Sequence, residues 1–523
     1  MNTQTLSPSY FSTPNTGRHA VVIGGSMAGL LAARVLTDYF EQVTIIDRDT
    51  FPDLPDHRKG VPQSHHAHAL LARGQEIIDR LFPGIMDELR AEGALSACGV
   101  VPVAFVTPKG ALPLLKQDEE FLAFSRFLLE WHVRRRLTTQ TSVRCLTNCE
   151  VTGLLSTPER TQVIGVRLHH RDEDADSTHS VAADLVVDAS GRHSKAPEWL
   201  VRLGYSAPPE ETINSGIGYA SRFYAKPSNF PADWQGIIIN NRPPHNPRAG
   251  LILPIEHGRW HVTLGGFAGN YPPTDESGFL QWARDLADPS LFEAIRIAEP
   301  ISPIRGYRTP QNRLRHFERL DRWPIGFIAT GDSVCAFNPI YGQGMTTSAL
   351  DALVLADCLS QQQRSPKPGF ERRFQKQLAK TIAAPWLIAT AEDLRWRSQG
   401  VTLSGARPRI GLGFLHGYMN LVLQQACEDT TVTRAYINVL GMTAPPQSLM
   451  QPHILLRVLS GALKSINESD VGAGERKTIF ILRYLNGARR LALYLKVSTE
   501  TQVAPRRKVP RSHLLMNCDQ PRN

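Results

Sequence analysis

Hydrophobic residues near the start of the chain form short runs separated by a helical pattern. Apolar runs predict buried strands at 20–23, 43–46 and 185–188. The first run is followed by a helical period from Leu30 to Phe40. A buried strand, a helix and a second buried strand in this order predict a βαβ unit, which places parallel strands in one sheet.

The pattern changes further along the chain. Positions between 205 and 320 alternate in the way typical of a large antiparallel sheet with one covered face. Residues 324–360 return to a strand, a loop and a helix, whereas 75–140 and 368–465 have mainly helical patterns. The chain is therefore predicted to be α/β, with a split Rossmann-like domain, an inserted β-sheet substrate domain and a helical C-terminal region.

These changes of pattern define the expected domains. The predicted segments are a disordered lead-in at 1–17, the first part of a nucleotide-binding domain at 18–204, a β-rich substrate domain at 205–320, the second part of the nucleotide-binding domain at 321–365, a helical region at 366–470, and a basic helix and tail at 471–523. An insertion of this kind commonly forms one wall of a pocket at the domain junction.

A glycine-rich turn follows the first strand, with the sequence Gly24-Gly25-Ser26-Met27-Ala28-Gly29. Such a turn brings the N–H groups at the start of a helix close to a pyrophosphate, although Ser26 replaces the usual middle glycine. Asp47 and Arg48 follow the second strand about 20 residues later, where a carboxylate binds ribose hydroxyls. The acid favours an unphosphorylated ribose, so the motif predicts FAD or NAD rather than NADP. The alternative is a strand-turn-helix without a ligand.

A second candidate loop follows the apolar run that ends at Thr330. Asp332 lies at the end of this predicted strand, where its carboxylate can accept a sugar hydroxyl. A loop rich in proline and glycine then leads into a helical pattern near Gly344. The N–H groups near Gly342, Gly344 and Met345 lie at the start of this helix and can hold negative charge. This loop predicts a phosphate or flavin site.

Two further segments carry candidate cofactor residues. Arg58 and Lys59 can neutralise the charge of a pyrophosphate, and Gln63 can form a hydrogen bond with a ring or a ribityl chain. Arg126 begins a predicted helix with Ser125 as its N-cap, and from there it can reach a phosphate or a flavin. An exposed arginine on a helix is the alternative interpretation of Arg126.

The turn Asp188–Ser194 can pack beneath a dinucleotide or bind a second one, and the alternative is a plain strand-to-loop turn. His65, His66 and His68 lack a carboxylate or cysteine at metal-ligand spacing, so we favour packing in a cofactor loop or surface positions, and predict no metal site. The seven cysteines show no metal spacing either and are typical of reduced, cytoplasmic thiols.

The formal net charge of +9 is concentrated at the C-terminus, where residues 471–523 contain eleven lysines and arginines and three acids. No basic-aromatic motif accompanies this charge, so nucleic-acid binding is not expected. The chain lacks an apolar run long enough to span a membrane. Residues 476–497 predict either a terminal helix packed on the domain, which we favour, or an interfacial helix in peripheral contact with a membrane.

Three motifs together resemble those of the FAD-dependent, single-component group A monooxygenases, which share the fold of p-hydroxybenzoate hydroxylase and include squalene epoxidase. They occur in the order of that family and are Gly24-x-Ser26-x-x-Gly29, Asp188-Ala189-Ser190-Gly191, and Gly331-Asp332 with Asn338-Pro339-Ile340-Tyr341-Gly342-Gln343-Gly344-Met345. The resemblance covers roughly residues 18–440. Three segments look closer still to bacterial FAD-dependent epoxidases of polyether antibiotic biosynthesis, namely Arg58–His68, Asp188–Leu200 and Tyr307–Met345.

The resemblance implies the role of each motif. The glycine-rich turn would line the FAD pyrophosphate, Asp47 would hold the adenosine ribose, and Asp332 would bind the ribityl or pyrophosphate region. The loop up to Met345 would lie against the isoalloxazine. The residues expected to bind FAD are Gly24, Gly25, Ser26, Met27, Ala28, Gly29, Asp47, Arg48, Arg58, Lys59, Gln63, Arg126, Asp188, Asp332, Pro339, Gly342, Gly344 and Met345.

The same resemblance implies a reaction. NADPH or NADH would reduce FAD, and O₂ would then give a C4a-hydroperoxyflavin that epoxidises or hydroxylates a hydrophobic substrate, of the kind found in secondary metabolism. The cofactor carries out the chemistry, so no catalytic residue is assigned. Candidate residues of the pocket wall in the β-rich insertion are Tyr219, Phe223, Trp260 and Phe267, and the alternative place for each is the core of the sheet.

Other functions share this framework. A flavin-dependent halogenase is disfavoured because the sequence lacks a Trp-x-Trp-x-Ile-Pro motif. A reductase or dehydrogenase acting on isoprenoid chains remains an alternative, as does a flavin-binding redox sensor without enzymatic turnover. The sequence contains no Gly-x-Ser-x-Gly motif, which argues against a hydrolase.

Overall fold

The computed structural model of the protein describes residues 17–100, 103–174, 177–405 and 411–469. Residues 1–16 of the predicted lead-in lie outside the described residues, and Gly17 begins the first strand. The predicted basic helix and tail at 471–523, including 476–497, also lie outside them.

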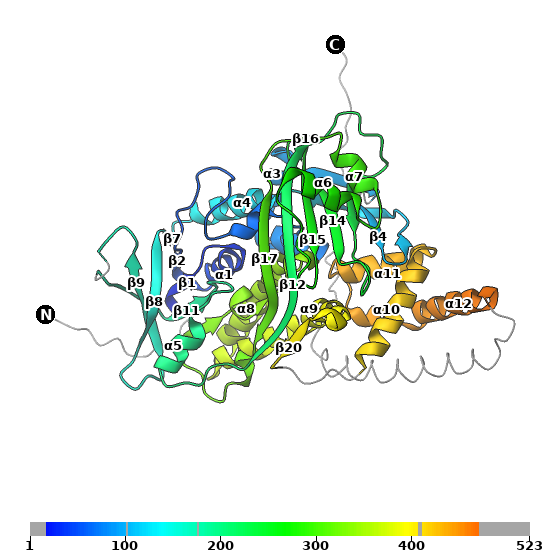
Figure 1. Cartoon of the computed structure of the whole chain (residues 1–523). Helices are drawn as coiled ribbons and strands as arrows, with labels where there is room; N and C mark the ends of the chain where they lie inside the picture. The colour runs from blue at the N-terminus through cyan, green and yellow to red at the C-terminus, as the bar shows by residue number, and fades with distance from the viewer. Residues whose placement is uncertain (1–16, 101–102, 175–176, 406–410, 470–523) are drawn as a thin grey trace, which may run out of the picture.

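A parallel five-stranded sheet forms the centre of the nucleotide-binding half (Figure 1). Its strand order is β18 (Phe327–Ala329), β11 (Leu185–Asp188), β1 (Gly17–Ile23), β2 (Phe40–Ile46) and β7 (Val143–Leu146). Strand β18 comes from a part of the chain far beyond the other four, which confirms the predicted split. The inner strands are short apolar runs, as expected for parallel strands that are covered on both faces.

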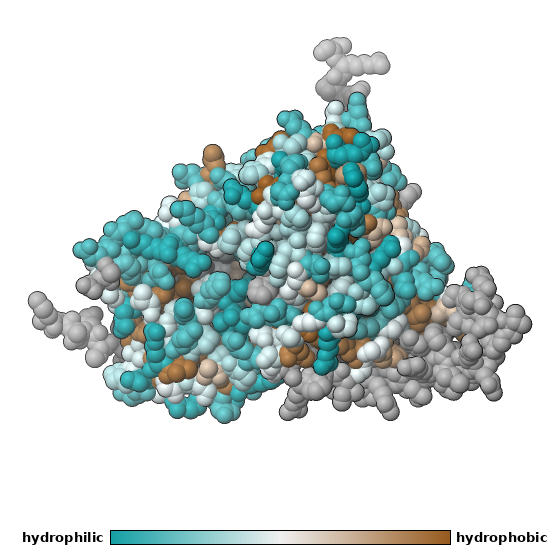
Figure 2. Space-filling model, viewed as in Figure 1, coloured by the Kyte–Doolittle hydropathy of each residue, from teal (hydrophilic) through white to brown (hydrophobic). Residues whose placement is uncertain are grey.

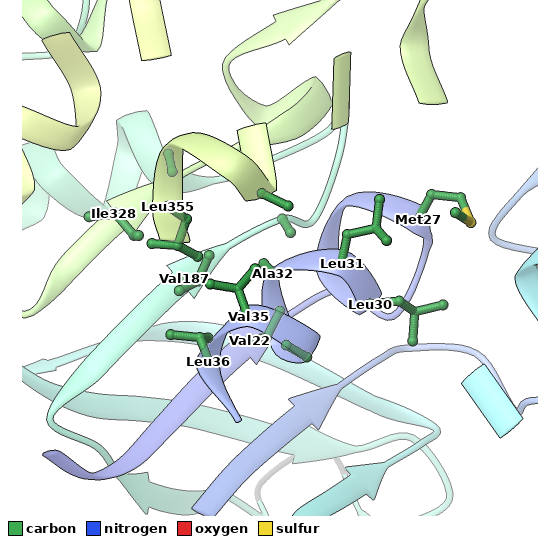
Figure 3. Close-up of a cluster of buried hydrophobic side chains, with 14 of the residues drawn as sticks. Val22, Met27, Leu30, Leu31, Ala32, Val35, Leu36, Val187, Ile328 and Leu355 are labelled. Atoms are coloured by element: carbon green, nitrogen blue, oxygen red, sulfur yellow. The ribbon is translucent and has the colours of Figure 1, made fainter. Parts of the chain in front are cut away.

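Helix α1 (Met27–Leu36) packs on this sheet through Leu31, Ala32 and Val35, as Figure 3 shows. Side chains from β11, β18 and α8 meet α1 in the same cluster, including Val187 and Leu355 (Figure 3). The other helices of this half are α2 (Ala72–Leu81), α3 (Ile85–Ala91), α4 (Arg126–Thr138), α5 (Ala196–Arg202), α8 (Gly344–Arg364) and α9 (Phe370–Asp393).

A ten-stranded sheet forms the second half and contains the long strands at the centre of Figure 1. Its strand order is β19 (Cys335–Ala336), β17 (Arg305–Arg315), β12 (Glu210–Ala225), β15 (Arg259–Gly266), β14 (Arg248–Ile255), β13 (Gly236–Ile239), β4 (Val103–Thr107) and β5 (Gly110–Ala111). Strands β16 (Glu299–Pro300) and β20 (Thr402–Ser404) also pair with β12. One face packs against α6 (Glu276–Arg284) and α7 (Ser290–Ile295).

The helical pattern predicted for 75–140 is wrong for its middle part. Four strands replace it, namely β4, β5 and the two-stranded pair β3 (Leu95–Val100) and β6 (Lys116–Ala123). Strand β4 pairs in parallel with β13, so residues from the first part of the chain extend the inserted sheet. Tertiary pairing with a distant strand overrode the local pattern here. A further three-stranded sheet contains β8 (Cys149–Ser156), β9 (Val163–His170) and β10 (His179–Ala182).

Helices complete the described chain, as the pattern of 368–465 predicted. They are α10 (Leu412–Ala426), α11 (Thr430–Leu440) and α12 (Pro452–Ser469), which share their own apolar cluster. Figure 2 shows one face of the molecule, on which polar residues predominate and apolar residues form small scattered groups. Within the described ranges, no helix has both the length and the apolar character that crossing a bilayer requires.

Candidate functional site

The turn between β1 and α1 lies against a neighbouring strand because of its glycines. Gly24 has a φ of 101°, and a Cβ there would lie 2.4 Å from the carbonyl oxygen of Ala189. A Cβ on Gly29 would lie 1.8 Å from the carbonyl oxygen of Gly24. Ser26 precedes α1 without a side-chain cap, and the first turn contains no acidic residue. The first N–H groups of the helix therefore face the turn without a side-chain acceptor, as at helix ends that bind anions.

Arg126 lies beside this turn. Ser125 accepts a hydrogen bond from a backbone N–H of the first turn of α4 at 3.2 Å, which confirms the predicted cap. From this position Arg126 donates to the Ser26 hydroxyl at 2.8 Å and lies 3.1 Å from Glu130. Burial opposes ionisation of Glu130, but the guanidinium groups of Arg126 and Arg58 hold the pKa of its carboxyl below the ordinary value. The cluster is therefore charged and buried.

Arg58 connects this cluster to the end of β2. Its Nε donates to Glu130 at 2.8 Å, and its guanidinium lies 3.2 Å from Asp47 and 3.3 Å from Asp49. The Asp47 carboxylate accepts the N–H of Gly25 at 2.6 Å. The acid predicted to bind ribose thus holds the glycine-rich turn in place.

Asp332 approaches the same turn from the distant part of the chain. It lies in the 3₁₀ turn η3 (Gly331–Ser333), and a Cβ on Gly331 would lie 2.6 Å from the Ala28 side chain. Burial raises the pKa of the Asp332 carboxyl, and the positive charges of Arg192, Arg126 and Arg313 oppose this. Within the described residues, no group donates a hydrogen bond to this carboxylate, which leaves it as an acceptor beside α1.

The start of α8 forms the next part of the site. A 3₁₀ turn, η4 (Pro339–Tyr341), leads to Gly342, whose φ of 63° is left-handed. Helix α8 then begins at Gly344 without a side-chain cap or an acid in its first turn. Among the described residues, a Cβ on Gly344 would have no heavy atom within 4 Å, and Oε1 of the buried Gln343 has no hydrogen-bond partner. This second uncapped helix start therefore faces open space.

A cavity of about 730 Å³ adjoins this loop. Its walls come from the loop around η4, from the large sheet, and from α9 to α11, and they are mostly apolar. Gln63, Tyr219 and Phe267 line it, and their predicted roles near the flavin or the substrate stay predictions. The Tyr219 hydroxyl also accepts the N–H of Ile340 at 3.0 Å, which fixes the loop against the sheet. The geometry is thus a glycine-rich turn of the kind that binds dinucleotides, followed by a large apolar cavity, called the apolar chamber below.

A model of the family described as "FAD binding domain" matches residues 18–366. This chain belongs to that family. Protein Rv3254 of Mycobacterium tuberculosis (strain ATCC 25618 / H37Rv) is similar to this chain. The two are 35% identical over 416 residues, which is 74% of this chain and 85% of that protein.

Solved structures share the fold of this FAD-binding family protein. The flavin-dependent brominase Bmp2 has a TM-score of 0.58 and 16% identity, and the match covers 86% of this chain and 100% of that one. The p-nitrophenol 4-monooxygenase PnpA from Pseudomonas putida DLL-E4 has a TM-score of 0.57 and 16% identity, covering 82% of this chain and 98% of that one. The inferred resemblance is confirmed for family and fold. Its closer likeness to polyether epoxidases stays a prediction.

The described residues fit FAD. The uncapped start of α1 and the Arg126 guanidinium suit the pyrophosphate, and Asp332 offers a free acceptor for a hydroxyl of the ribityl chain. The open space at Gly344 and the Gln343 amide oxygen, which lacks a partner among the described residues, suit the edge of the isoalloxazine ring. FAD would therefore extend from the glycine-rich turn to the start of α8.

Some predicted residues lie at the margin of this arrangement. The Asp188 carboxylate is fully buried and accepts the hydroxyls of Ser190 and Ser194, both at 2.5 Å, so it shapes its own turn. The side chains of Arg48 and Lys59 are exposed and form no ion pair with the described residues of the cluster. The side chains of Met27 and Met345 are buried in the core, which leaves only their backbone for the cofactor.

Two of the predicted pocket residues lie elsewhere. Trp260 is fully buried on the opposite face of the sheet, where it packs against Phe230 and Trp234. Its neighbours along β15 explain this, because side chains alternate between faces and His261 and Thr263 take the cavity side. Phe223 lies on the cavity face but lines a separate, smaller cavity. The expectation that Trp260 lines the pocket is therefore wrong, whereas the role of Phe223 stays a prediction.

A buried polar junction lies behind the loop. Asp393, at the end of α9, accepts the Tyr341 hydroxyl at 2.5 Å and the Asn338 amide at 2.9 Å, and it also accepts the Asn312 amide. Asn338 further donates to Ser215 at 2.6 Å. Burial raises the pKa of Asp393 to about 7, which the hydrogen bonds oppose. The junction joins the expected flavin loop to the end of α9 and, through Asn312 and Ser215, to the large sheet.

Sequence reasoning missed several of these residues. The spacing of Arg126 and Glu130, four apart on one helix, was a signal for Glu130. Asp49 follows Asp47 by two residues and has no distinct motif of its own. Asp393 and Tyr341 meet only in the folded protein, because no local pattern connects the end of α9 to the loop.

Replacing Asp351 with Asn is expected to change how stability depends on pH. Asp351 accepts the N–H of Gly331 at 3.0 Å, and burial raises the pKa of its carboxyl from 3.8 to about 7. A raised pKa in the folded state means that the contribution to stability is complete below the unfolded value and is lost as pH rises through the folded value. Between about pH 4 and about pH 8, Asp351→Asn should therefore gain roughly 2 to 4 kcal/mol relative to the wild type. Urea unfolding across this range measures the difference, and a difference that is constant with pH contradicts the prediction.

Proposed function

We propose that this protein is an FAD-dependent monooxygenase that uses NADPH or NADH and O₂ to insert one oxygen atom into a hydrophobic substrate by epoxidation or hydroxylation. The observation that supports it best is the apolar cavity of about 730 Å³ at the loop expected to hold the flavin. A chamber of this size and character suits a substrate without charges. The substrate class and the partners remain those expected from the sequence.

The mechanism needs little acid-base chemistry from the chain. When bound, FAD supplies two-electron transfer from the nicotinamide and activation of O₂. The glycine-rich turn and Arg126 bind and orient its phosphates, and the start of α8 positions its ring. Tyr219 and Phe267 place the substrate, and the apolar lining excludes water from the reacting atoms.

Turnover of the FAD-loaded protein tests this proposal. Oxidation of NADPH or NADH should consume O₂, and an accepted apolar substrate should gain the mass of one oxygen atom. A requirement for chloride or bromide would instead indicate a halogenase, and a change of hydrogen content without oxygen a reductase or dehydrogenase. Bound FAD that neither nucleotide reduces would favour a redox sensor. Each of these three results contradicts the proposal.

A further inference from the structure

The apolar chamber meets solvent through polar residues. Most of its wall is buried or half-buried, including Tyr219 and Phe267, which belong to the apolar cluster that packs against the expected flavin loop. Among the described residues, the exposed part of the wall consists of Lys109, Arg242, His245, Asn438 and Thr443. All five have polar side chains, and we call them the rim. The chamber therefore has an apolar interior and a polar rim.

The two cations of the rim come from one end of the large sheet. Lys109 lies in the turn between β4 and β5, and Arg242 lies in the loop between β13 and β14. Strands β4 and β13 pair in parallel, and beyond them the N–H of Asn240 donates to the carbonyl of Val106 at 2.9 Å. Because parallel strands end at the same edge, the two loops leave the sheet side by side. Lys109 and Arg242 therefore lie at the same side of the rim.

The charge of the rim is not balanced by the chamber wall. Lys109 and Arg242 are exposed and form no ion pair with a described residue. The acidic residue among the described lining residues is Glu392, which lies 2.8 Å from Arg395 in an ion pair of its own. Burial lowers the pKa of His66 to about 4, so this ring in the wall is uncharged at neutral pH. The rim is therefore basic, whereas the interior is close to neutral.

We propose that the substrate is an amphipathic organic anion, whose uncharged apolar body fills the chamber and whose carboxylate or phosphate group stays at the rim beside Lys109 and Arg242. The proposal rests on the proposed function, because it takes the chamber as the substrate site. An anionic group without a partner is costly to bury in the apolar interior. At the rim it keeps contact with water and gains two cations that suit carboxylates and phosphates. The anchored group also determines which part of the body reaches the loop at η4.

Calorimetry with the FAD-loaded full-length protein tests the proposal without relying on turnover. The probes are decanoate, decyl phosphate and decan-1-ol, which share one apolar chain, and each is used below the concentration at which it forms micelles. All three should bind, because the chamber accepts the chain. Added salt should weaken the binding of the two anions but not that of the alcohol, since it screens exposed charges. Tighter binding of decanoate supports a carboxylate as the natural head group, and tighter binding of decyl phosphate supports a phosphate.

Variants of the rim separate the charge from the apolar contacts. Lys109→Gln and Arg242→Gln should each raise the dissociation constant of decanoate about threefold, and the double variant about tenfold, because exposed charge pairs are modest and independent contributions add. The affinity for decan-1-ol should change by less than about twofold. The matched control is the double variant Arg144→Gln/Lys376→Gln, which removes two exposed cations outside the chamber wall and should leave all three affinities unchanged.

A variant of the interior tests where the chain lies. Ile238 is half-buried in the chamber wall, so Ile238→Trp narrows the chamber without changing the charge of the rim. It should weaken the binding of all three probes by a similar factor. Retention of the wild-type affinities in this variant would show that the probes bind outside the chamber and would overturn the proposal.

Three further results would overturn the proposal. They are a failure of all three probes to bind, an unchanged affinity for both anions in the double variant of the rim, and an equal loss of anion affinity in the control double variant. The proposed function has a separate readout. A protein that binds decanoate through the rim, but whose FAD neither NADPH nor NADH reduces, would overturn the proposed function while the preference of the chamber for anionic amphiphiles remained.

Discussion

Gly344→Val is expected to give a folded protein that purifies without flavin. The residue begins α8, and a Cβ there meets no heavy atom of the described residues within 4 Å, so this part of the protein tolerates a side chain. The space that valine would fill is the space assigned to the flavin ring. Overlap with the ring should lower the affinity for FAD about 100-fold or more, or about 3 kcal/mol. Visible absorbance after reconstitution measures the bound FAD, and thermal unfolding of the apoprotein measures the fold.

The matched control for this prediction is Gly413→Val. Gly413 is the second residue of α10, and a Cβ there would likewise meet no heavy atom within 4 Å in the part of the chain that the structure describes. This helix is not part of the loop and helix start assigned to the flavin. This variant should retain FAD. If Gly344→Val binds FAD as tightly as the wild type, the flavin ring does not lie at the start of α8. If the Gly344→Val apoprotein unfolds at a much lower temperature than the wild-type apoprotein, the site is not open as described.

Asp393→Ala is expected to lower the free energy of unfolding by about 3 kcal/mol and to weaken FAD binding. The substitution removes the acceptor of three buried donors, from Tyr341, Asn338 and Asn312. A buried donor without a partner lowers the stability by the full cost of its desolvation. Because Tyr341 and Asn338 belong to the loop expected to hold the flavin, the loop should also lose its position. Urea unfolding and FAD titration measure the two effects.

Glu392→Ala provides the comparison, because it removes the carboxylate of the preceding residue. Glu392 is half-exposed and pairs with Arg395 at 2.8 Å, a type of ion pair that contributes about 1 kcal/mol or less. An unfolding free energy for Asp393→Ala that matches that of Glu392→Ala would show that the junction does not stabilise the loop.

The nucleotide-binding half was predictable because its signals are local. A buried strand, the turn Gly24–Gly29 and an acid after the next strand occur within one unit, and the same logic applies to Asp332 and the start of α8. The match to the FAD-binding family and the fold shared with solved flavoenzymes agree with this part of the prediction. Side-chain roles were less predictable, since Asp188 bonds to its own turn and Lys59 is exposed.

The walls of the cavities depended on pairings that the sequence does not show. Strand β4 joins the large sheet by pairing with β13, more than a hundred residues away, and this overrides a local helical pattern. Trp260 and His261 are adjacent, yet the pleat places them on opposite faces, and periodicity alone does not reveal which face is the cavity. The junction at Asp393 likewise forms only when three distant segments meet.

The visible absorption spectrum of the purified protein, followed by release and identification of the bound chromophore, tests the central claim most directly. The split site predicts stoichiometric, non-covalently bound FAD, either as purified or after reconstitution, that anaerobic NADPH or NADH bleaches. A colourless protein that cannot be reconstituted with FAD would contradict the account.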